Sequence, residues 1–238
     1  MDAAGTRAVS GAGTGAGADV LTACDLYRFY RAGEEETLAL RGVSLRVRRG
    51  ETVAVTGPSG SGKSTLLACL AGLDEPDGGV VHVGGERISH RPEAERARVR
   101  ARRIGVLFQS GNLLPHLDLR ANIRLARSAA RTPGNRGFDA SALLDRVGLP
   151  GRGRALPREL AGGELARAGL AVALANDPDL LLADEPTGEL DGTTEQRILE
   201  LLRERAHAGA GVLLVTHSTE VVRTADRVIT LRDGRSRR

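Results

Sequence analysis

Several residue types are scarce in this 238-residue sequence. It has no tryptophan, three phenylalanines and two tyrosines, so aliphatic side chains must fill the core. Its two cysteines, Cys24 and Cys69, form no CxxC or metal-ligand pattern, which indicates a reduced, cytoplasmic setting. No apolar run approaches the roughly 18 residues of a membrane-spanning helix, and we find no signal peptide. If the protein works at a membrane, we therefore expect a peripheral subunit.

Lysine is almost absent as well. Lys63 is the single lysine in a sequence with 34 basic residues, and all the others are arginine. The formal net charge of +4 is spread along the chain among 30 acidic residues, so charge alone selects no partner. A position that keeps lysine in such a chain is expected to need a compact ammonium on a flexible stem.

The hydrophobic pattern predicts one folded unit over residues 20–238. Residues 1–19 are rich in glycine and alanine and are predicted to be a flexible tail. Strand-like patterns cover 40–48, 51–56, 80–83, 104–108, 180–183, 212–216 and 228–231, and helical patterns cover 64–72, 91–103 and 194–205. The alternation of strand and helix in the last third predicts an α/β core with a parallel-rich sheet. The helical middle, about 88–168, is predicted to be an inserted subdomain.

One glycine-rich segment matches the phosphate-binding motif G-x-x-x-x-G-K-[ST]. It reads Gly57-Pro58-Ser59-Gly60-Ser61-Gly62-Lys63-Ser64-Thr65. A predicted strand precedes it and a predicted helix follows it. The glycines let backbone N–H groups turn inward around phosphate oxygens, and the helix N-terminus adds partial positive charge. We predict that Lys63 contacts the β- and γ-phosphates of a nucleotide and that Ser64 ligates Mg²⁺.

Two carboxylates follow the apolar strand at residues 180–183. Asp184 and Glu185 would be an ordinary acidic helix cap before Pro186 if the segment stood alone. Beside a phosphate-binding loop, Asp184 is predicted to hold the Mg²⁺ shell. Glu185 is predicted to polarise the attacking water as a general base.

A third motif identifies the type of nucleotide-binding protein. Leu160-Ala161-Gly162-Gly163-Glu164 precedes an apolar helix and lies between the other two motifs. It resembles the signature L-S-G-G-[QE] of ABC ATPases. The resemblance implies a P-loop NTPase core of the ABC type, with an N-terminal antiparallel β portion and an inserted helical subdomain. It also implies a head-to-tail dimer, because in that family the signature binds the γ-phosphate of ATP held by the other subunit.

The resemblance assigns roles to further residues. The matches are Gln109 (the Q-loop residue that touches metal and water and senses the permease), Asp191 (the D-loop aspartate), His217 (the switch histidine on the γ-phosphate) and Tyr30 (the aromatic that stacks on adenine). A lone histidine at a strand end is more often structural, so the role of His217 rests on the whole set. The assignment of Tyr30 is looser, because Tyr27 and Phe29 are close by.

The chain departs from the family pattern at three places. Ala161 stands where the family has serine, and Ser218 replaces the aspartate that commonly follows the switch histidine. After the signature, Leu165-Ala166-Arg167 stands in place of the usual Gln-Gln-Arg or Arg-Gln-Arg. A hydrogen bond to a charged group is worth about 1.5–3 kcal/mol, or roughly 10- to 100-fold in rate if it acts only in the transition state. We therefore expect a slow ATPase whose ATP binding is intact.

Residues 108–115 and 231–235 are similar to a subfamily that serves lipoprotein-release, macrolide-export and cell-division permeases. This implies an ATP- and Mg²⁺-dependent ATPase, as a homodimer or a heterodimer with a similar ATPase, that drives a separate integral membrane permease. We expect it at the inner face of the cell membrane, working in export or extraction. A mechanical or regulatory module that signals through a permease-like partner without transport is the alternative.

A soluble ABC protein acting on DNA or ribosomes is a third possibility. DNA-repair relatives carry long coiled coils between the P-loop and the signature, and translation relatives pair two such domains in one chain. The sequence shows neither feature, so no nucleic-acid partner is expected. The arginine-rich run over 91–103 also contains Glu93 and Glu95 and is expected to be a solvated helix face, with contact to anionic lipid as the alternative.

Overall fold

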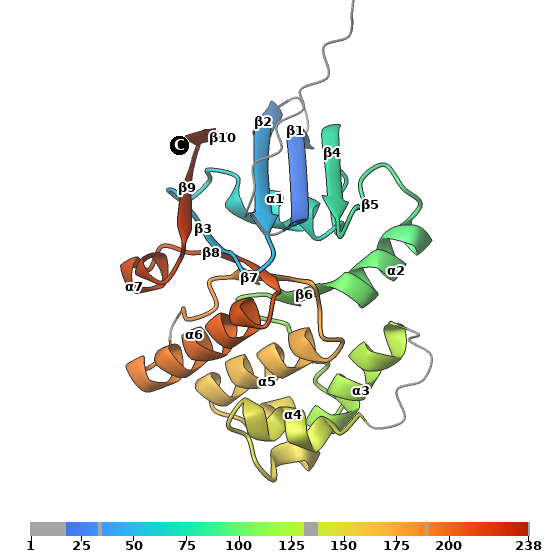
Figure 1. Cartoon of the computed structure of the whole chain (residues 1–238), viewed down its shortest axis with the longest axis vertical. Helices are drawn as coiled ribbons and strands as arrows, with labels where there is room; N and C mark the ends of the chain where they lie inside the picture. The colour runs from blue at the N-terminus through green and yellow to red at the C-terminus, as the bar shows by residue number, and fades with distance from the viewer. Residues whose placement is uncertain (1–17, 33–34, 131–137, 189, 238) are drawn as a thin grey trace, which may run out of the picture.

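The computed structural model describes residues 18–32, 35–130, 138–188 and 190–237 of the chain. Four N-terminal strands form an antiparallel sheet in the order β2-β1-β4-β5 (Figure 1). Their bounds are β1 Asp19–Ala32, β2 Glu35–Arg48, β4 Gly78–Val83 and β5 Glu86–Arg87. Most of the predicted flexible tail over residues 1–19 lies outside the described residues, and Asp19 already begins β1.

A six-stranded sheet forms the centre of the molecule, in the order β10-β9-β3-β8-β7-β6. Its strands are β3 Thr52–Thr56, β6 Ile104–Leu107, β7 Leu180–Asp184, β8 Gly211–Val215, β9 Arg227–Arg232 and β10 Arg235–Arg237. Neighbours from β9 to β6 are parallel, and β10 is antiparallel to β9. All five residues of β8 are buried, as expected for a strand covered on both faces. The parallel-rich sheet and the antiparallel N-terminal portion are thus both confirmed.

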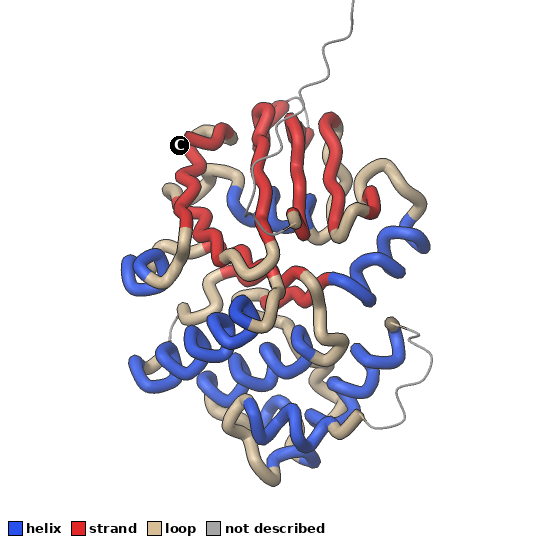
Figure 2. Tube along the Cα trace, in the orientation of Figure 1, coloured by secondary structure: helices blue, strands red, loops and turns tan. Residues whose placement is uncertain are grey.

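The helices surround the parallel sheet, and most of them gather at one end of the molecule (Figure 2). They are α1 Lys63–Leu70, α2 Glu93–Arg103, α3 Leu119–Ala129, α4 Ala140–Arg146, α5 Gly162–Leu174, α6 Gly192–His207 and α7 Thr219–Arg223, with 3₁₀ turns at Arg152–Arg154 and Pro157–Glu159. The predicted helical subdomain over 88–168 contains α2, α3 and α4. It also contains β6, which pairs with β7 in the six-stranded sheet.

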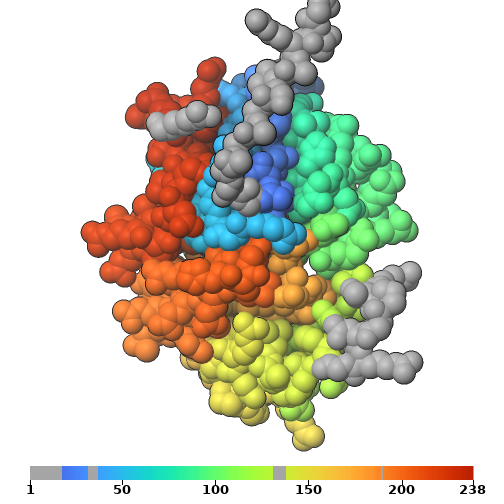
Figure 3. Space-filling view, in the orientation of Figure 1, coloured from blue at the N-terminus to red at the C-terminus, as the bar shows by residue number. Residues whose placement is uncertain are grey.

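Alternate residues of the parallel strands face two separate cores. Leu180 and Leu182 of β7 pack in one core with residues of α1 and the antiparallel sheet. Leu181 and Ala183 pack in the other with residues of α5 and α6. Because successive side chains of a strand point to opposite faces, α1 and α5 lie on opposite faces of the sheet. In the space-filling view, the yellow and orange residues of α4 to α6 lie below the blue residues of the N-terminal strands (Figure 3).

The arginine-rich helix α2 is held by ion pairs. Arg96 and Arg100 both contact Glu93, and Arg103 contacts Asp179 at the start of β7. Pairs of this kind on an exposed helix add little stability, but they neutralise much of the charge on its surface. Within the described residues, no helix has the length and apolar character needed to cross a bilayer.

Candidate active site

Four predicted site segments meet at one edge of the six-stranded sheet. The glycine-rich loop follows β3, Gln109 follows β6, Asp184 and Glu185 end β7, and His217 follows β8. These strands are parallel neighbours, so their carboxyl ends lie at the same edge. Ligands of open α/β sheets bind at this edge. The strand order therefore brings together residues that are more than 150 positions apart in the chain, Gly57 and His217 among them.

The glycine-rich loop is closed around the ammonium of Lys63. The Nζ atom donates to the carbonyl oxygens of Gly57, at 2.8 Å, and Pro58, at 2.9 Å. Gly62 precedes α1 with φ 98°, a left-handed conformation that glycine adopts without strain. The side chain of the lone lysine is thus folded over the concave side of the loop, at the N-terminus of α1. This is the place at which a phosphate group would meet both the ammonium and the helix N–H groups.

The back of the loop is pressed against the C-terminal hairpin of the chain. A Cβ atom at Gly57 would lie 2.1 Å from the carbonyl oxygen of Leu231 in β9. The N–H of Gly234, in the turn between β9 and β10, donates to the carbonyl oxygen of Ser61 at 3.2 Å. The shape of the loop therefore depends on a segment at the far end of the sequence.

Asp184 lies beside the loop at the end of β7. Its carboxylate is half-buried and hydrogen-bonded to Ser64. Burial raises the pKa of Asp184 above its ordinary value, and the neighbouring charge of Glu185 adds to the rise, while the Ser64 hydrogen bond opposes it. A carboxylate and a hydroxyl in contact are hard oxygen ligands of the kind that Mg²⁺ prefers.

Glu185 is fixed by the end of β8. Its Oε1 lies 2.8 Å from Nδ1 of His217, and its Oε2 accepts hydrogen bonds from the Thr216 hydroxyl, at 3.2 Å, and from the His217 N–H, at 3.3 Å. The backbone of Glu185 has φ 46°, a left-handed conformation that costs a non-glycine residue about 1–3 kcal/mol. The hydrogen bond from Glu185 N to Val215 O, at 2.8 Å, holds it there. Backbone strain of this kind is common at active sites, where a side chain must be held in one orientation.

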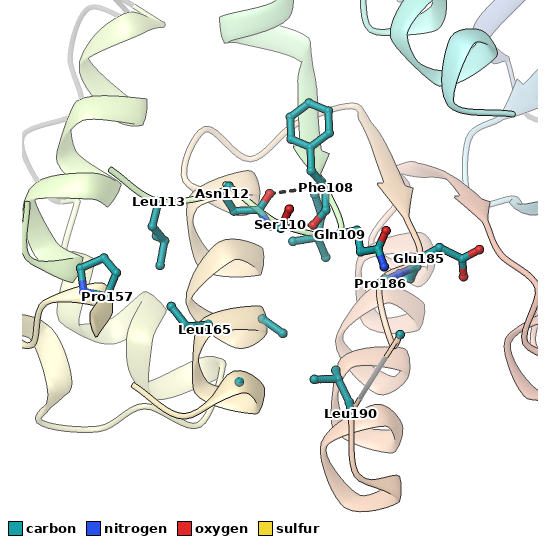
Figure 4. A pocket seen from close by; sticks show the side chains of 15 residues that line it. Phe108, Gln109, Ser110, Asn112, Leu113, Pro157, Leu165, Glu185, Pro186 and Leu190 are labelled. Atoms are coloured by element: carbon teal, nitrogen blue, oxygen red, sulfur yellow. Dashed lines mark hydrogen bonds between the residues drawn. The ribbon is translucent and has the colours of Figure 1, made fainter. Parts of the chain in front are cut away.

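Gln109 and Glu185 line one cavity of about 280 Å³ (Figure 4). The cavity lies between the segment after β6, the segment after β7 and the first turn of α5, which contributes Gly162 and Leu165. Gln109 is exposed and comes from the loop that Asn112 braces through hydrogen bonds to the backbone of Phe108. The cavity thus connects the predicted Q-loop residue to both the acidic strand end and the signature segment.

The signature segment forms the N-terminus of α5. The first hydrogen bond within this helix runs from Leu165 N to Ala161 O, so the N–H groups of Gly162, Gly163 and Glu164 are not used by it. Glu164 instead accepts a hydrogen bond from Ala161 N at 3.0 Å. Three free N–H groups at a helix start suit an anion. These groups lie on the face of the sheet opposite to α1, so the structure does not bring them to the glycine-rich loop of the same chain.

The remaining predicted residues have structural contacts of their own. Asp191 is the N-cap of α6 and accepts hydrogen bonds from the N–H groups of Thr193 and Thr194. Ser218 is the N-cap of α7, a task that the aspartate common at this position could also perform. Glu189, beside the D-loop aspartate, lies outside the described residues. Neither contact tests the predicted roles toward a nucleotide.

Two groups of contacts were not predicted from the sequence. Thr216 was assigned no role, although its hydroxyl donates to Glu185. The Tyr30 hydroxyl donates to Asp74 at 2.7 Å, and Asp74 also accepts from Arg28. Asp74 is 44 residues from Tyr30, and no motif marks it.

Within the described part of the chain, no group of three or more His, Cys, Asp and Glu residues could form a metal site by itself. Asp184 and Ser64 instead fit a metal ion that takes only one or two ligands from the protein. Mg²⁺ usually takes one or two protein ligands and completes its shell with phosphate oxygens and water. A magnesium ion at this place would therefore depend on a bound nucleotide.

Known proteins match most of the length of this chain. Residues 40–188 match the family model described as ABC transporter. An ABC transporter ATP-binding protein of Thermotoga maritima is 45% identical over 91% of this chain and 93% of its own length. The lipoprotein-releasing system ATP-binding protein of Pseudomonas fluorescens is 42% identical over 90% of this chain and 96% of its own length.

The macrolide export ATP-binding/permease protein of Rhodopirellula baltica is 43% identical over 88% of this chain. The chain spans only 31% of that protein's length. Among solved structures, a bacterial ABC transporter cassette determined as a dimer has a TM-score of 0.86 and 34% identity over 92% of this chain and 97% of its own. The same cassette has also been determined as a dimer in a post-hydrolysis state, bound to ADP and Pi.

Proposed function

The chain belongs to the ABC transporter ATP-binding family, and we propose that it hydrolyses ATP to drive a separate membrane permease. One observation carries the catalytic part of the proposal. The Glu185 carboxylate is aimed by His217 and Thr216 at the same sheet edge as the glycine-rich loop. A loop that only bound nucleotide would need no oriented carboxylate next to it.

The chemistry divides among the residues at this edge. Lys63 and the backbone N–H groups of the loop bind the β- and γ-phosphates, where Lys63 exchanges its two carbonyl acceptors for phosphate oxygens. Ser64 and Asp184 would hold Mg²⁺ and Gln109 would contact it, and the ion would supply positive charge to neutralise the phosphates. Glu185 accepts a proton from the attacking water. His217, kept in place by Glu185, contacts the γ-phosphate.

A complete site needs two copies of the cassette. The free N–H groups at the start of α5 suit the γ-phosphate. They cannot reach a γ-phosphate bound by the glycine-rich loop of their own chain, because α5 and α1 lie on opposite faces of the sheet. A head-to-tail dimer places the α5 N-terminus of one copy over the glycine-rich loop of the other. The dimeric cassette to which this chain is similar supports this arrangement. We propose a homodimer or a heterodimer with a similar ATPase, and Asp191 would lie near the shared interface.

The permease is the remaining partner. The relatives named for lipoprotein release and macrolide export support export or extraction as the process. The lipoprotein-releasing relative, of which this chain spans 96%, supports a permease on a separate chain, whereas the macrolide-export relative is named as a combined ATP-binding/permease protein. We propose that the cassette lies at the cytoplasmic face of the membrane. The helices between β6 and β7 would form the subdomain that faces the permease, since the segment with Gln109 leads into them and shares a cavity with the start of α5.

The test separates ATP binding from hydrolysis. Glu185→Gln keeps the shape of the side chain but cannot accept the proton, so the variant should bind MgATP and sediment as a dimer, and as a monomer without nucleotide. Lys63→Ala should lose most of its ATP affinity and stay monomeric. Hydrolysis by Glu185→Gln at the wild-type rate would refute the role of the base. A monomer under both conditions, with the permease partner present, would refute the shared site.

A further inference from the structure

Tyr30 is tied to the segment that follows α1 by a charged pair. Asp74 accepts from the Tyr30 hydroxyl at 2.7 Å and from Nε and Nη2 of Arg28 at 2.9 and 2.7 Å. The second acceptor of Arg28 is Asp77, at 3.1 Å. Such a fork between arginine and carboxylate fixes direction as well as distance. The phenol ring is thus held at its far end, although 40% of the residue is exposed.

The charged pair also covers one face of the Tyr30 ring. The Arg28 guanidinium lies over the Tyr30 ring, 4.8 Å from its centroid, and occupies one face. The side chains of Arg28 and Asp74 are only 21% and 25% exposed. Burial opposes ionisation of Asp74, but the hydrogen bonds from Tyr30 and Arg28 outweigh it and keep the pKa of Asp74 below its usual value. The pair is therefore charged at neutral pH, and it covers one face of a ring that remains 40% exposed.

The ring also lies next to the glycine-rich loop. The Tyr30 hydroxyl is in hydrogen-bond contact with Thr65, in the first turn of α1, in addition to Asp74. Thr65 directly follows Ser64, the last residue of the phosphate-binding motif. A partly exposed flat aromatic surface beside a phosphate cradle suits the base of a nucleotide whose phosphates occupy that cradle.

We propose that Asp74 and Arg28 are positioning residues that hold the Tyr30 ring ready to stack on the base of the bound nucleoside triphosphate. The proposal rests on the proposed function, and it adds a means by which the base, rather than the phosphates, contributes to affinity. Without the pair, the exposed ring is free to rotate, and base binding must then order it. Ordering one side chain on binding changes affinity by roughly 2- to 10-fold.

Two ligands separate positioning from a general role in folding. MgATP uses both the ring and the glycine-rich loop, whereas magnesium with inorganic tripolyphosphate uses the loop alone. Asp74→Asn keeps the volume of the side chain but removes its charge. We expect the variant to bind ATP about 3- to 10-fold more weakly and to bind tripolyphosphate as wild type does, measured by isothermal titration calorimetry. Arg28→Lys should recover only part of the loss, because lysine cannot form the fork.

A neighbouring residue supplies the matched control. Glu75 follows Asp74 directly and pairs with Arg96 at 3.0 Å, but no described contact joins it to Tyr30. Glu75→Gln makes the same change of charge and breaks an ion pair in the same segment, so the ratio of the two affinities should stay at the wild-type value. Tyr30→Phe removes only the hydroxyl and should resemble Asp74→Asn, which gives a second route if Asp74→Asn folds poorly.

Each result has a definite meaning. An unchanged affinity for ATP in Asp74→Asn and Tyr30→Phe would refute the positioning role. Equal weakening of ATP and tripolyphosphate would also refute it, since that is the effect of a distorted loop. Failure of the wild-type chain to bind either ligand would instead refute the proposed function.

Discussion

Ala161 is the position at which one added atom should change both stability and turnover. It is the N-cap of α5, with φ −70° and ψ 160°, the extended conformation typical of N-cap residues. It is exposed, so a hydroxyl would meet no steric obstacle. Glu164 already supplies one half of a capping box by accepting from Ala161 N at 3.0 Å. Ala161→Ser should complete the other half.

The size of both effects follows from this geometry. Serine in place of alanine at an N-cap is worth about 1 kcal/mol, which corresponds to a rise of roughly 2–4 °C in Tm for a chain of this size. A serine hydroxyl can accept from the helix and still donate, so it can also contact the γ-phosphate held by the partner cassette. A bond of this kind formed only in the transition state should raise turnover about 10-fold, the lower end of what a hydrogen bond to a charged group provides.

Ala161→Asp separates the two effects. Aspartate caps a helix as well as serine does, so it should raise Tm similarly, but it has no proton to donate and repels the γ-phosphate. We would measure thermal unfolding without nucleotide and steady-state ATPase activity with the permease partner present. Equal turnover in wild type and Ala161→Ser would mean that the helix N–H groups suffice or that chemistry does not limit turnover. The expectation of a slow enzyme would then be wrong.

Three further predictions follow from single contacts. Because Lys63 is the only lysine, an amine-reactive reagent should modify only Lys63 and the N-terminal amine, and MgATP should protect Lys63. If mass spectrometry finds no protection by MgATP, the contact between Lys63 and phosphate is contradicted. Although burial opposes ionisation of Glu51, the hydrogen bond from its arginine partner on β9 keeps its pKa low, so Glu51→Gln should cost about 1 kcal/mol at pH 7. That cost is present above the unfolded pKa and should disappear as the pH falls through the lower folded pKa, so urea unfolding that shows a constant difference down to pH 3 would refute the pairing. Gly57→Ala should lower the free energy of unfolding by about 1–3 kcal/mol more than Gly60→Ala does. A Cβ atom at Gly57 would lie 2.1 Å from the Leu231 carbonyl oxygen, whereas a Cβ atom at Gly60 would meet nothing within 4 Å. Equal losses of stability in the two variants would contradict this packing.

The types of most elements could be predicted from local pattern. The helix expected over 64–72 is α1, Lys63–Leu70, and the strand expected over 180–183 is β7, Leu180–Asp184. Both patterns are set by a few adjacent residues, namely the glycine-rich turn before the helix and the apolar run that makes up the strand. The strand expected over 104–108 is β6, Ile104–Leu107, which interrupts the helical middle that was outlined over 88–168.

The site was predicted as a set of motifs and not as a set of contacts. The predicted loop, acidic pair and histidine do lie at one edge of the sheet, as the strand order places them. The sequence could not show that Thr216 and His217 aim Glu185, or that Asp74 holds Tyr30. Ser218, counted among the departures from the family pattern, is the N-cap of α7, a contact that no motif indicated.

The sequence by itself determined the chemistry of this protein. Local residue types decide which segment can cradle a phosphate, which strand end carries carboxylates and where the lone lysine stands, because each property depends on neighbours along the chain. Only the tertiary structure decided the orientation of these groups. Glu185 takes its direction from the end of β8, and Gly57 is forced to be glycine by β9, since strands far apart in sequence become neighbours only when the sheet is assembled.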